Sequence, residues 1–90
     1  MKDLKETVDL MQSDDYKERF IAEYVQVKIR TLKLLKIVRS HFNGGEKIKL
    51  NCPIGILINQ LAAMGDYLDV LRNRAEIEEI ELPEIKIDEQ

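Results

Sequence analysis

The sequence predicts an all-α protein: an antiparallel helical hairpin, with two long helices plus a short N-terminal helix, that packs as a homo-oligomer. Two stretches of helical periodicity, at about residues 13–42 and 51–78, carry this prediction. The third observation is length, because a lone helix pair of 90 residues buries little apolar surface. We therefore expect the hairpin to complete its core by self-association.

The segment 51–78 has the clearest apolar face. Asn51 is a suitable N-cap, and Pro53 suits a first helical turn, where a missing N–H is tolerated. We therefore expect the helix to begin at Asn51. Apolar residues then recur at alternating spacings of three and four and form one seam: Ile54, Leu57, Leu61, Met64, Leu68, Leu71 and Ala75.

The N-terminal part predicts two further helices. Leu4, Val8 and Met11 have the spacing of a short amphipathic helix. Ser13 is the predicted N-cap of a long helix, which we expect to end near Phe42. The residues after Phe42 accept left-handed dihedral angles at little cost, namely Asn43, Gly44 and Gly45. A short extended connector is expected at residues 46–50.

The long helix carries two apolar rows. One row, interrupted by Thr31, contains Phe20, Tyr24, Val27, Leu34 and Val38. The other, interrupted by Lys28, contains Ile21, Val25, Leu32 and Leu35. Together they span a wider arc than one partner helix covers, so we expect more than one neighbour. We interpret the additional neighbour as another subunit.

Charge and proline divide the chain into a helical hairpin domain, residues 1–82, and an acidic C-terminal tail, residues 83–90. Pro83 ends any helical continuation. Residues 76–90 hold seven acids and one base, whereas the rest of the chain holds 10 acids and 13 bases. Because Ile85 and Ile87 alternate with charged residues, the tail is either disordered or an extended arm docked on a neighbour. We favour disorder for about the last five residues.

The sequence contains no motif typical of catalysis. It has no glycine-rich phosphate loop, no HExxH, no paired cysteines and no nucleophile elbow. Cys52 is the single cysteine and is interpreted as a small buried side chain. We therefore predict no enzymatic activity, no catalytic residue, no metal and no cofactor. Without an apolar run of roughly 18 to 20 residues or the apolar core of a signal peptide, we expect a cytoplasmic protein with no membrane contact.

A basic run extends from Tyr24 to Gly45 and contains no acid. Cations often collect near a helix C-terminus and on its solvated face, which is one explanation. The other is an anion site, to which Lys28, Lys36 and Arg39 would contribute. Nucleic acid is an unlikely partner, because the net charge is −3 and the acidic tail would repel a phosphate backbone.

Tyrosines and further arginines complete the candidate ligand-binding set. A tyrosine offers a flat apolar face to a purine and a hydroxyl to its edge, although many tyrosines only line the rim of a helical core. The full set is Tyr16, Arg19, Tyr24, Lys28, Lys36, Arg39, Tyr67, Arg72 and Arg74.

Two ordered motifs give the sequence a family resemblance. The first is DYxxRxxxEY, from Asp15 to Tyr24, and the second is CPI at Cys52 followed by LxxQxxxMxxYLxxLxxRAEIE from Leu57. Over about residues 13–82, the chain resembles a family of small phage-encoded helical proteins related to a crAssphage hypothetical protein. More distantly, through Leu61, Met64, Arg74 and Ala75, it resembles phage sponge proteins that sequester nucleotide immune signals.

The sponge resemblance implies a phage-type anti-defence binding protein. We expect it to sequester a small anionic nucleotide ligand in pockets between subunits, in the host cell cytoplasm. The alternative, from another functional class, is a protein-interaction module that inhibits a host protein by direct binding. Stabilisation by nucleotides would favour the first interpretation, and a stable complex with a host protein would favour the second.

Overall fold

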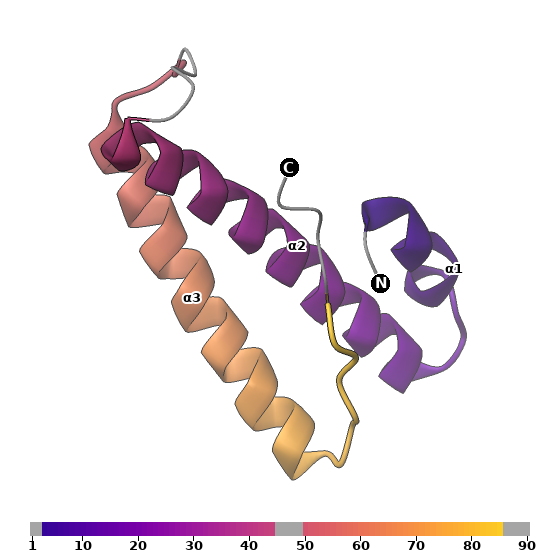
Figure 1. The fold of residues 1–90 in the computed structure, drawn as a ribbon. Coiled ribbons are helices and arrows are strands. Elements are labelled where there is room, and N and C mark those ends of the chain that lie inside the picture. Colours follow the sequence, from indigo (N-terminus) through magenta and orange to yellow (C-terminus); the bar gives the residue numbers. More distant parts are fainter. Residues whose placement is uncertain (1–2, 45–49, 86–90) are drawn as a thin grey trace.

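The computed structural model describes residues 3–44 and 50–85, and its regular elements are all helical. Two long helices, α2 (Tyr16–Asn43) and α3 (Ile54–Ile77), pack against each other as a hairpin (Figure 1). The one-turn helix η1 (Leu4–Thr7) and α1 (Val8–Met11) precede them. The predicted all-α class, the hairpin and the short N-terminal helix are confirmed.

Both long helices begin later than predicted. Asp15 is the N-cap of α2, because its carboxylate accepts the Lys17 N–H at 2.9 Å. Ser13 lies in the turn before the helix, where its hydroxyl accepts the Asp15 N–H at 3.0 Å and donates to Glu18 at 2.8 Å. The prediction that Ser13 is the cap was therefore wrong.

The predicted cap of α3 was also wrong. The helix begins at Ile54, after Pro53, whose φ of −58° and ψ of 143° are extended. A helix capped by Asn51 would require Cys52 to be helical. Because a residue that precedes proline is disfavoured in the α region, Cys52 is not helical, and the helix cannot start before Pro53.

Each long helix ends with a residue in the left-handed region. Gly44 has a φ of 67° and ends α2 after Asn43, close to the predicted position. At the end of α3, Glu79 has a φ of 57°, and the Ile80 N–H bonds the Ala75 carbonyl at 2.8 Å. A second bond, from the Glu79 N–H to the Glu76 carbonyl, completes a Schellman motif. This motif, and not Pro83, ends the helix.

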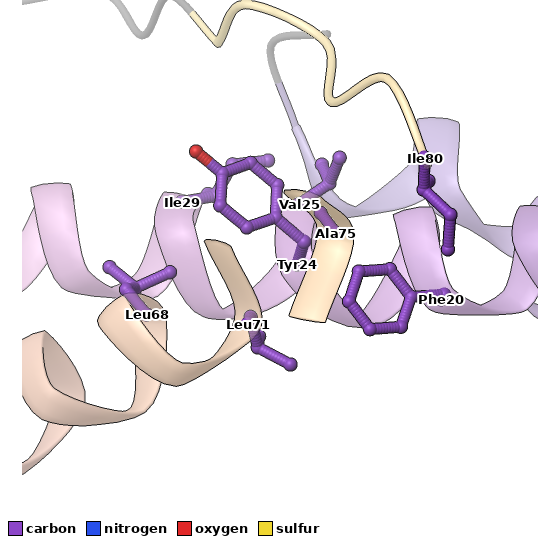
Figure 2. Close-up of a cluster of buried hydrophobic side chains, with 8 residues drawn as sticks. All are labelled: Phe20, Tyr24, Val25, Ile29, Leu68, Leu71, Ala75 and Ile80. Atoms are coloured by element: carbon purple, nitrogen blue, oxygen red, sulfur yellow. The ribbon is translucent and has the colours of Figure 1, made fainter. Parts of the chain in front are cut away.

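The buried core lies where the start of α2 meets the end of α3. Its eight residues are Phe20, Tyr24, Val25 and Ile29 from α2, Leu68, Leu71 and Ala75 from α3, and Ile80 from the segment that follows (Figure 2). The last three seam residues are therefore buried, as the hairpin requires. The first four, Ile54, Leu57, Leu61 and Met64, are only half-buried. Ile29 is fully buried although it belongs to neither predicted row.

The second face of α2 is covered by the chain's own ends. Helix α1 lies on the side of α2 away from α3 (Figure 1), and the Gln26 amide donates to the buried Thr7 hydroxyl at 3.0 Å. After α3 the chain runs back along α2, where Leu82 and Ile85 pack against the core. The wide apolar arc of α2 therefore does not require a second subunit, and homo-oligomerisation stays a prediction.

The packing of Ile85 bears on the expected tail. Residue 85 lies beyond the predicted boundary at residue 82, yet it contacts the same core as Leu4 and Leu82. The division at residue 82 stays a prediction. Residues 46–49 of the expected connector and the last five residues, 86–90, lie outside the described part of the chain.

Helix α3 has an additional property of composition. Among the described residues, it is the one helix long and apolar enough to cross a membrane, with a mean hydropathy of 1.2 in its most apolar window. Helices that form the core of soluble proteins meet the same criterion, so this is weak support for a membrane location. In the structure, α3 packs along α2.

Candidate functional site

Arg74 is the centre of a small cluster that joins the two ends of the hairpin. Its Nη2 donates to the Tyr16 hydroxyl at 2.7 Å, and its Nε lies 3.5 Å from a carboxylate oxygen of Glu78. The guanidinium carbon lies 4.8 Å from the centroid of the Phe20 ring, which is a cation–π contact. We call these four residues, Tyr16, Phe20, Arg74 and Glu78, the Arg74 cluster.

Helical spacing and the hairpin register assemble this cluster. Tyr16 and Phe20 are four residues apart on α2, and their ring centroids lie 6.3 Å apart. Arg74 and Glu78 have the same spacing at the end of α3. Because the helices are antiparallel, the first turn of α2 lies beside the last turn of α3, and the two pairs meet.

Arg74 stays protonated in this environment. Desolvation lowers the pKa of Arg74, but the charge and hydrogen bond of Tyr16, together with Glu78, raise the pKa above its usual value. The side chain is 43% exposed, so a ligand can still reach it. A permanently charged, planar donor held against an aromatic ring is well suited to bind a phosphate or carboxylate.

Tyr67 lies further along the same edge of the hairpin. Its hydroxyl donates to the carboxylate of Glu23 on α2. This hydrogen bond is the main cause of a raised pKa for Tyr67, to which desolvation and the charge of Glu23 add, while Arg74 opposes them. Tyr67 and Arg74 are seven residues apart, a rise of about 10 Å along the helix. Two exposed tyrosines, Tyr16 and Tyr67, therefore flank Arg74 on one surface.

Tyr24 is placed differently from the other two tyrosines. It is only 7% exposed and belongs to the buried core. Figure 2 shows its ring among the apolar side chains, with the hydroxyl at the edge of the cluster. Of the two interpretations considered for the tyrosines, a position at the rim of the core describes Tyr24.

Arg19 and Arg72 bind neighbours on or next to their own helices. The Arg19 guanidinium donates to the Ser13 carbonyl at 2.8 Å, ahead of α2. Arg72 lies 3.1 Å from Asp69, one turn earlier on α3. Arg72 and Arg74 are two positions apart, which is about 200° around a helix, so the two guanidinium groups start from different faces.

The three candidate ligand residues from the basic run, Lys28, Lys36 and Arg39, lie further along α2 from its first turn. Lys28 is half-buried, whereas Lys36 and Arg39 are exposed. From Tyr16, the rise along the helix is about 18 Å to Lys28 and about 35 Å to Arg39. Within one chain, the nine candidate residues are therefore spread along the hairpin and do not form one small pocket.

A comparison with protein families identifies the chain's relatives. The family model Sequestin matches residues 14–77, which include both long helices in full. The chain belongs to the Sequestin family. Membership indicates a sequestering role and a binding protein without catalysis. No curated protein and no solved structure gave a match, and the expected relation to a crAssphage protein stays a prediction.

The Sequestin match includes the candidate ligand residues but not the segments that pack on the outside of the hairpin. All nine predicted ligand residues lie within positions 14–77, whereas η1, α1 and the returning segment after Glu78 lie outside. In this chain, the segments outside the match cover the second face of α2. The family region is therefore the hairpin itself, with its tyrosines and cations.

Three residues that contact Arg74 or Tyr67 were not among the predicted ligand residues: Phe20, Glu23 and Glu78. The spacings Tyr16–Phe20 and Arg74–Glu78 are visible in the sequence. Which turn of one helix faces which turn of the other is set by the hairpin register, and a single sequence does not contain that information. Among the described residues, no group of three or more His, Cys, Asp or Glu side chains has the arrangement of a metal site.

Proposed function

We propose that this protein sequesters a small anionic, nucleotide-derived immune signal, holding it without chemical conversion in pockets between subunits of a homo-oligomer. The observation that carries the proposal is the Sequestin match, which spans both long helices in full. In this proposal the protein is a phage-type anti-defence factor that acts in the host cell cytoplasm. Its alternative, direct inhibition of a host protein, makes different predictions.

The Arg74 cluster supports binding of a phosphorylated ligand. Arg74 offers guanidinium N–H groups at an exposed surface, and Tyr16 and Tyr67 offer aromatic faces beside it. Charge-assisted hydrogen bonds to phosphate are roughly twice as strong as neutral ones. A phosphate that replaced Glu78 as the partner of Arg74 would keep the charge paired, while a base could stack on a tyrosine ring.

The second group of cations supports a pocket that two subunits share. Lys28, Lys36 and Arg39 lie on a stretch of α2 without an acid, yet they are about 18 to 35 Å along the helix from Tyr16. One small ligand cannot contact both groups in a single chain. A second subunit that placed its cations beside the Arg74 cluster of the first would unite them.

Binding is tested by calorimetry and thermal shift with cyclic dinucleotides and ADP-ribose derivatives. We expect a ligand to raise the melting temperature, and Arg74→Glu, Lys28→Glu and Lys36→Glu to weaken its binding, because each removes an attraction and adds a repulsion. Lys17→Glu is the matched control, since Lys17 is an exposed lysine outside the candidate set. Equal and unperturbed binding in all three variants would rule out the proposed residues.

Sequestration also predicts the fate of the ligand. After the complex is denatured by heat, mass spectrometry should recover the ligand with its mass unchanged, because the protein binds it and does not convert it. Recovery of a hydrolysed or otherwise modified product would contradict the proposal and indicate an enzyme.

The alternative function would give a different pair of results. A module that inhibits a host protein should form a complex of fixed stoichiometry with that protein and gain no stability from any nucleotide in the panel. The acidic end of the hairpin is the feature that favours this alternative, because residues 66–85 hold seven acids and only two bases.

A further inference from the structure

Helix α3 carries a second apolar row that faces away from the core. Ile56, Ala63, Val70 and Ile77 recur at a spacing of seven residues, and all four are exposed. The exposed fractions of Ile56, Val70 and Ile77 are 56%, 56% and 81%. At 100° per residue, Val70 in this outer row lies about 100° around α3 from the buried Leu71 and about 160° from the buried Leu68. An apolar row exposed over the whole helix indicates a surface that is covered by a partner.

The spacing of the outer row indicates what kind of partner fits it. A repeat of seven residues keeps one side of a helix against another helix over several turns. Ala63 is small and allows close approach of a second backbone. The second face of α2 is already covered by the chain's own ends, whereas the outer row of α3 is exposed.

The outer row is complementary to itself when two copies run antiparallel. If Ala63 of one copy lies opposite Val70 of the second, then Ile56 of the first lies opposite Ile77 of the second, and the reverse pairs follow from two-fold symmetry. The small residue then faces a larger one, and the two end residues face each other. In a parallel pair, Ala63 would face Ala63 and leave a gap at the centre.

Charge also favours the antiparallel arrangement. Residues 28–44 hold five lysines and arginines and no acid, and residues 54–65 hold no charged side chain. Residues 13–27 and 66–85, at the other end of the hairpin, together hold eleven acids and four bases. An antiparallel pair sets the basic end of each copy beside the acidic end of the other, whereas a parallel pair sets the two acidic ends together.

From these observations we propose that α3 is the interface of a two-fold homodimer, in which the outer rows of two copies pack antiparallel with Ala63 opposite Val70. The inference stands on the exposed face of α3 and does not depend on a ligand. One consequence also rests on the proposed function and deepens it. In the dimer, the basic end of one copy lies beside the end of the other copy that carries the Arg74 cluster.

Light scattering coupled to size exclusion tests the dimer on the full chain without nucleotide. We expect twice the chain mass of 10.5 kDa, and a return to the single-chain mass for Val70→Glu, because a carboxylate cannot be buried in an apolar row. The matched control is Ile58→Glu. Ile58 is another exposed isoleucine of α3, but it lies about 120° around the helix from Val70. Circular dichroism checks that both variants keep their helices.

Cysteine cross-linking tests the register. In a Cys52→Ser background, a mixture of Ala63→Cys and Val70→Cys proteins should form a disulfide-linked dimer under mild oxidation, and either protein alone should not. In the antiparallel pair, two Ala63 positions are about 10 Å apart along the axis, which is beyond disulfide reach. Efficient self-linking of Ala63→Cys would instead show a parallel pair and overturn the register.

The outcomes separate this inference from the proposed function. A single-chain mass for the unaltered protein, or a dimer that persists in Val70→Glu, would overturn the interface. Monomers that bind anionic lipid vesicles through the same row would also overturn it, because a membrane would then be the partner. A monomer that still captures a nucleotide would refute the interface and leave sequestration intact. A dimer with the expected cross-link that binds no nucleotide would support the interface and contradict sequestration.

Discussion

At the scale of single residues, Glu79 occupies a position that favours glycine. Its φ of 57° places it in the left-handed region, where a residue with a Cβ is disfavoured by about 1 to 2 kcal/mol. Glu79 is nevertheless the residue through which the chain leaves α3 and returns towards α2. Its conformation is maintained by the Schellman hydrogen bonds and by burial of Ile80 in the core.

Replacing Glu79 by glycine should therefore stabilise the protein. We expect the free energy of unfolding to rise by about 0.5 to 1 kcal/mol, because relief of the left-handed strain exceeds the entropy that glycine adds to the unfolded chain. Chemical denaturation measures the change. Glu81→Gly is the control, since Glu81 has no positive φ, and it should give no gain. A loss of stability in Glu79→Gly would contradict the argument.

Tyr67 predicts a dependence of stability on alkaline pH. Its pKa in the folded state is raised, so the fold keeps this proton at pH values where the unfolded chain has lost it. The associated stability is fully present below the ordinary tyrosine pKa of about 10 and is lost as pH rises through the folded pKa.

Denaturation curves on both sides of the ordinary tyrosine pKa should therefore show a smaller alkaline loss in Tyr67→Phe than in the unaltered protein. Glu23→Gln is a second test, because it removes the charge that accepts the hydrogen bond and should also reduce the loss. Identical alkaline slopes in all three proteins would show that Tyr67 does not contribute.

At the scale of elements, the seam of α3 is one pattern in the sequence but is unevenly buried in the structure. Leu68 is 3% exposed, whereas Leu61 is half-buried in the single chain. We expect Leu68→Ala to cost about 2 to 5 kcal/mol, as truncation of a buried leucine does. Leu61→Ala should cost less than about 2 kcal/mol, because less apolar surface is lost. Urea denaturation of the two variants measures this difference, and equal costs would contradict the uneven core.

Periodicity was sufficient to predict the helices, but not what surrounds them. The seam and the two rows of α2 gave the hairpin, because helix faces are set by local spacing. The observed helix starts differ from the predicted ones because Ser13 and Asn51, taken as single cap residues, do not reveal the turn around Asp15 or the effect of Pro53 on Cys52. The second neighbour of α2 comes from the same chain, but nothing local in the sequence shows that Thr7 and Ile80 fold back onto this helix.

The candidate site was predictable in part for the same reason. Three of the predicted ligand residues, Tyr16, Tyr67 and Arg74, lie together on one surface, and their role in binding stays a prediction. Their grouping was not predictable, because it depends on which turns of the two helices meet. The register brings Phe20 and Glu78 to Arg74 and leaves Lys36 and Arg39 at the far end of α2.

At the scale of the whole molecule, the charges are divided between the two ends of the hairpin. If two copies pair antiparallel, unlike ends attract, and added salt should weaken the dimer. Between about 0.1 M and about 1 M salt, the Debye length falls from about 10 Å to about 3 Å, which screens exposed charges. Sedimentation velocity at both salt concentrations should show more of the single chain at high salt. A dimer strengthened by salt would indicate a parallel arrangement.

The position of the core also has a consequence for motion. Seven of the eight core residues come from the first half of α2 and the second half of α3, and the eighth follows α3. The opposite halves, which lie next to the connection between the helices, have mostly half-buried apolar side chains. Local opening requires the least free energy where few apolar contacts are lost. We therefore expect backbone amides of residues 30–43 and 54–64 to exchange their hydrogens with solvent faster than those around Val25 and Leu71. The half of α2 that carries Lys36 and Arg39 is then the more adaptable half, and a bound anion would slow its exchange first.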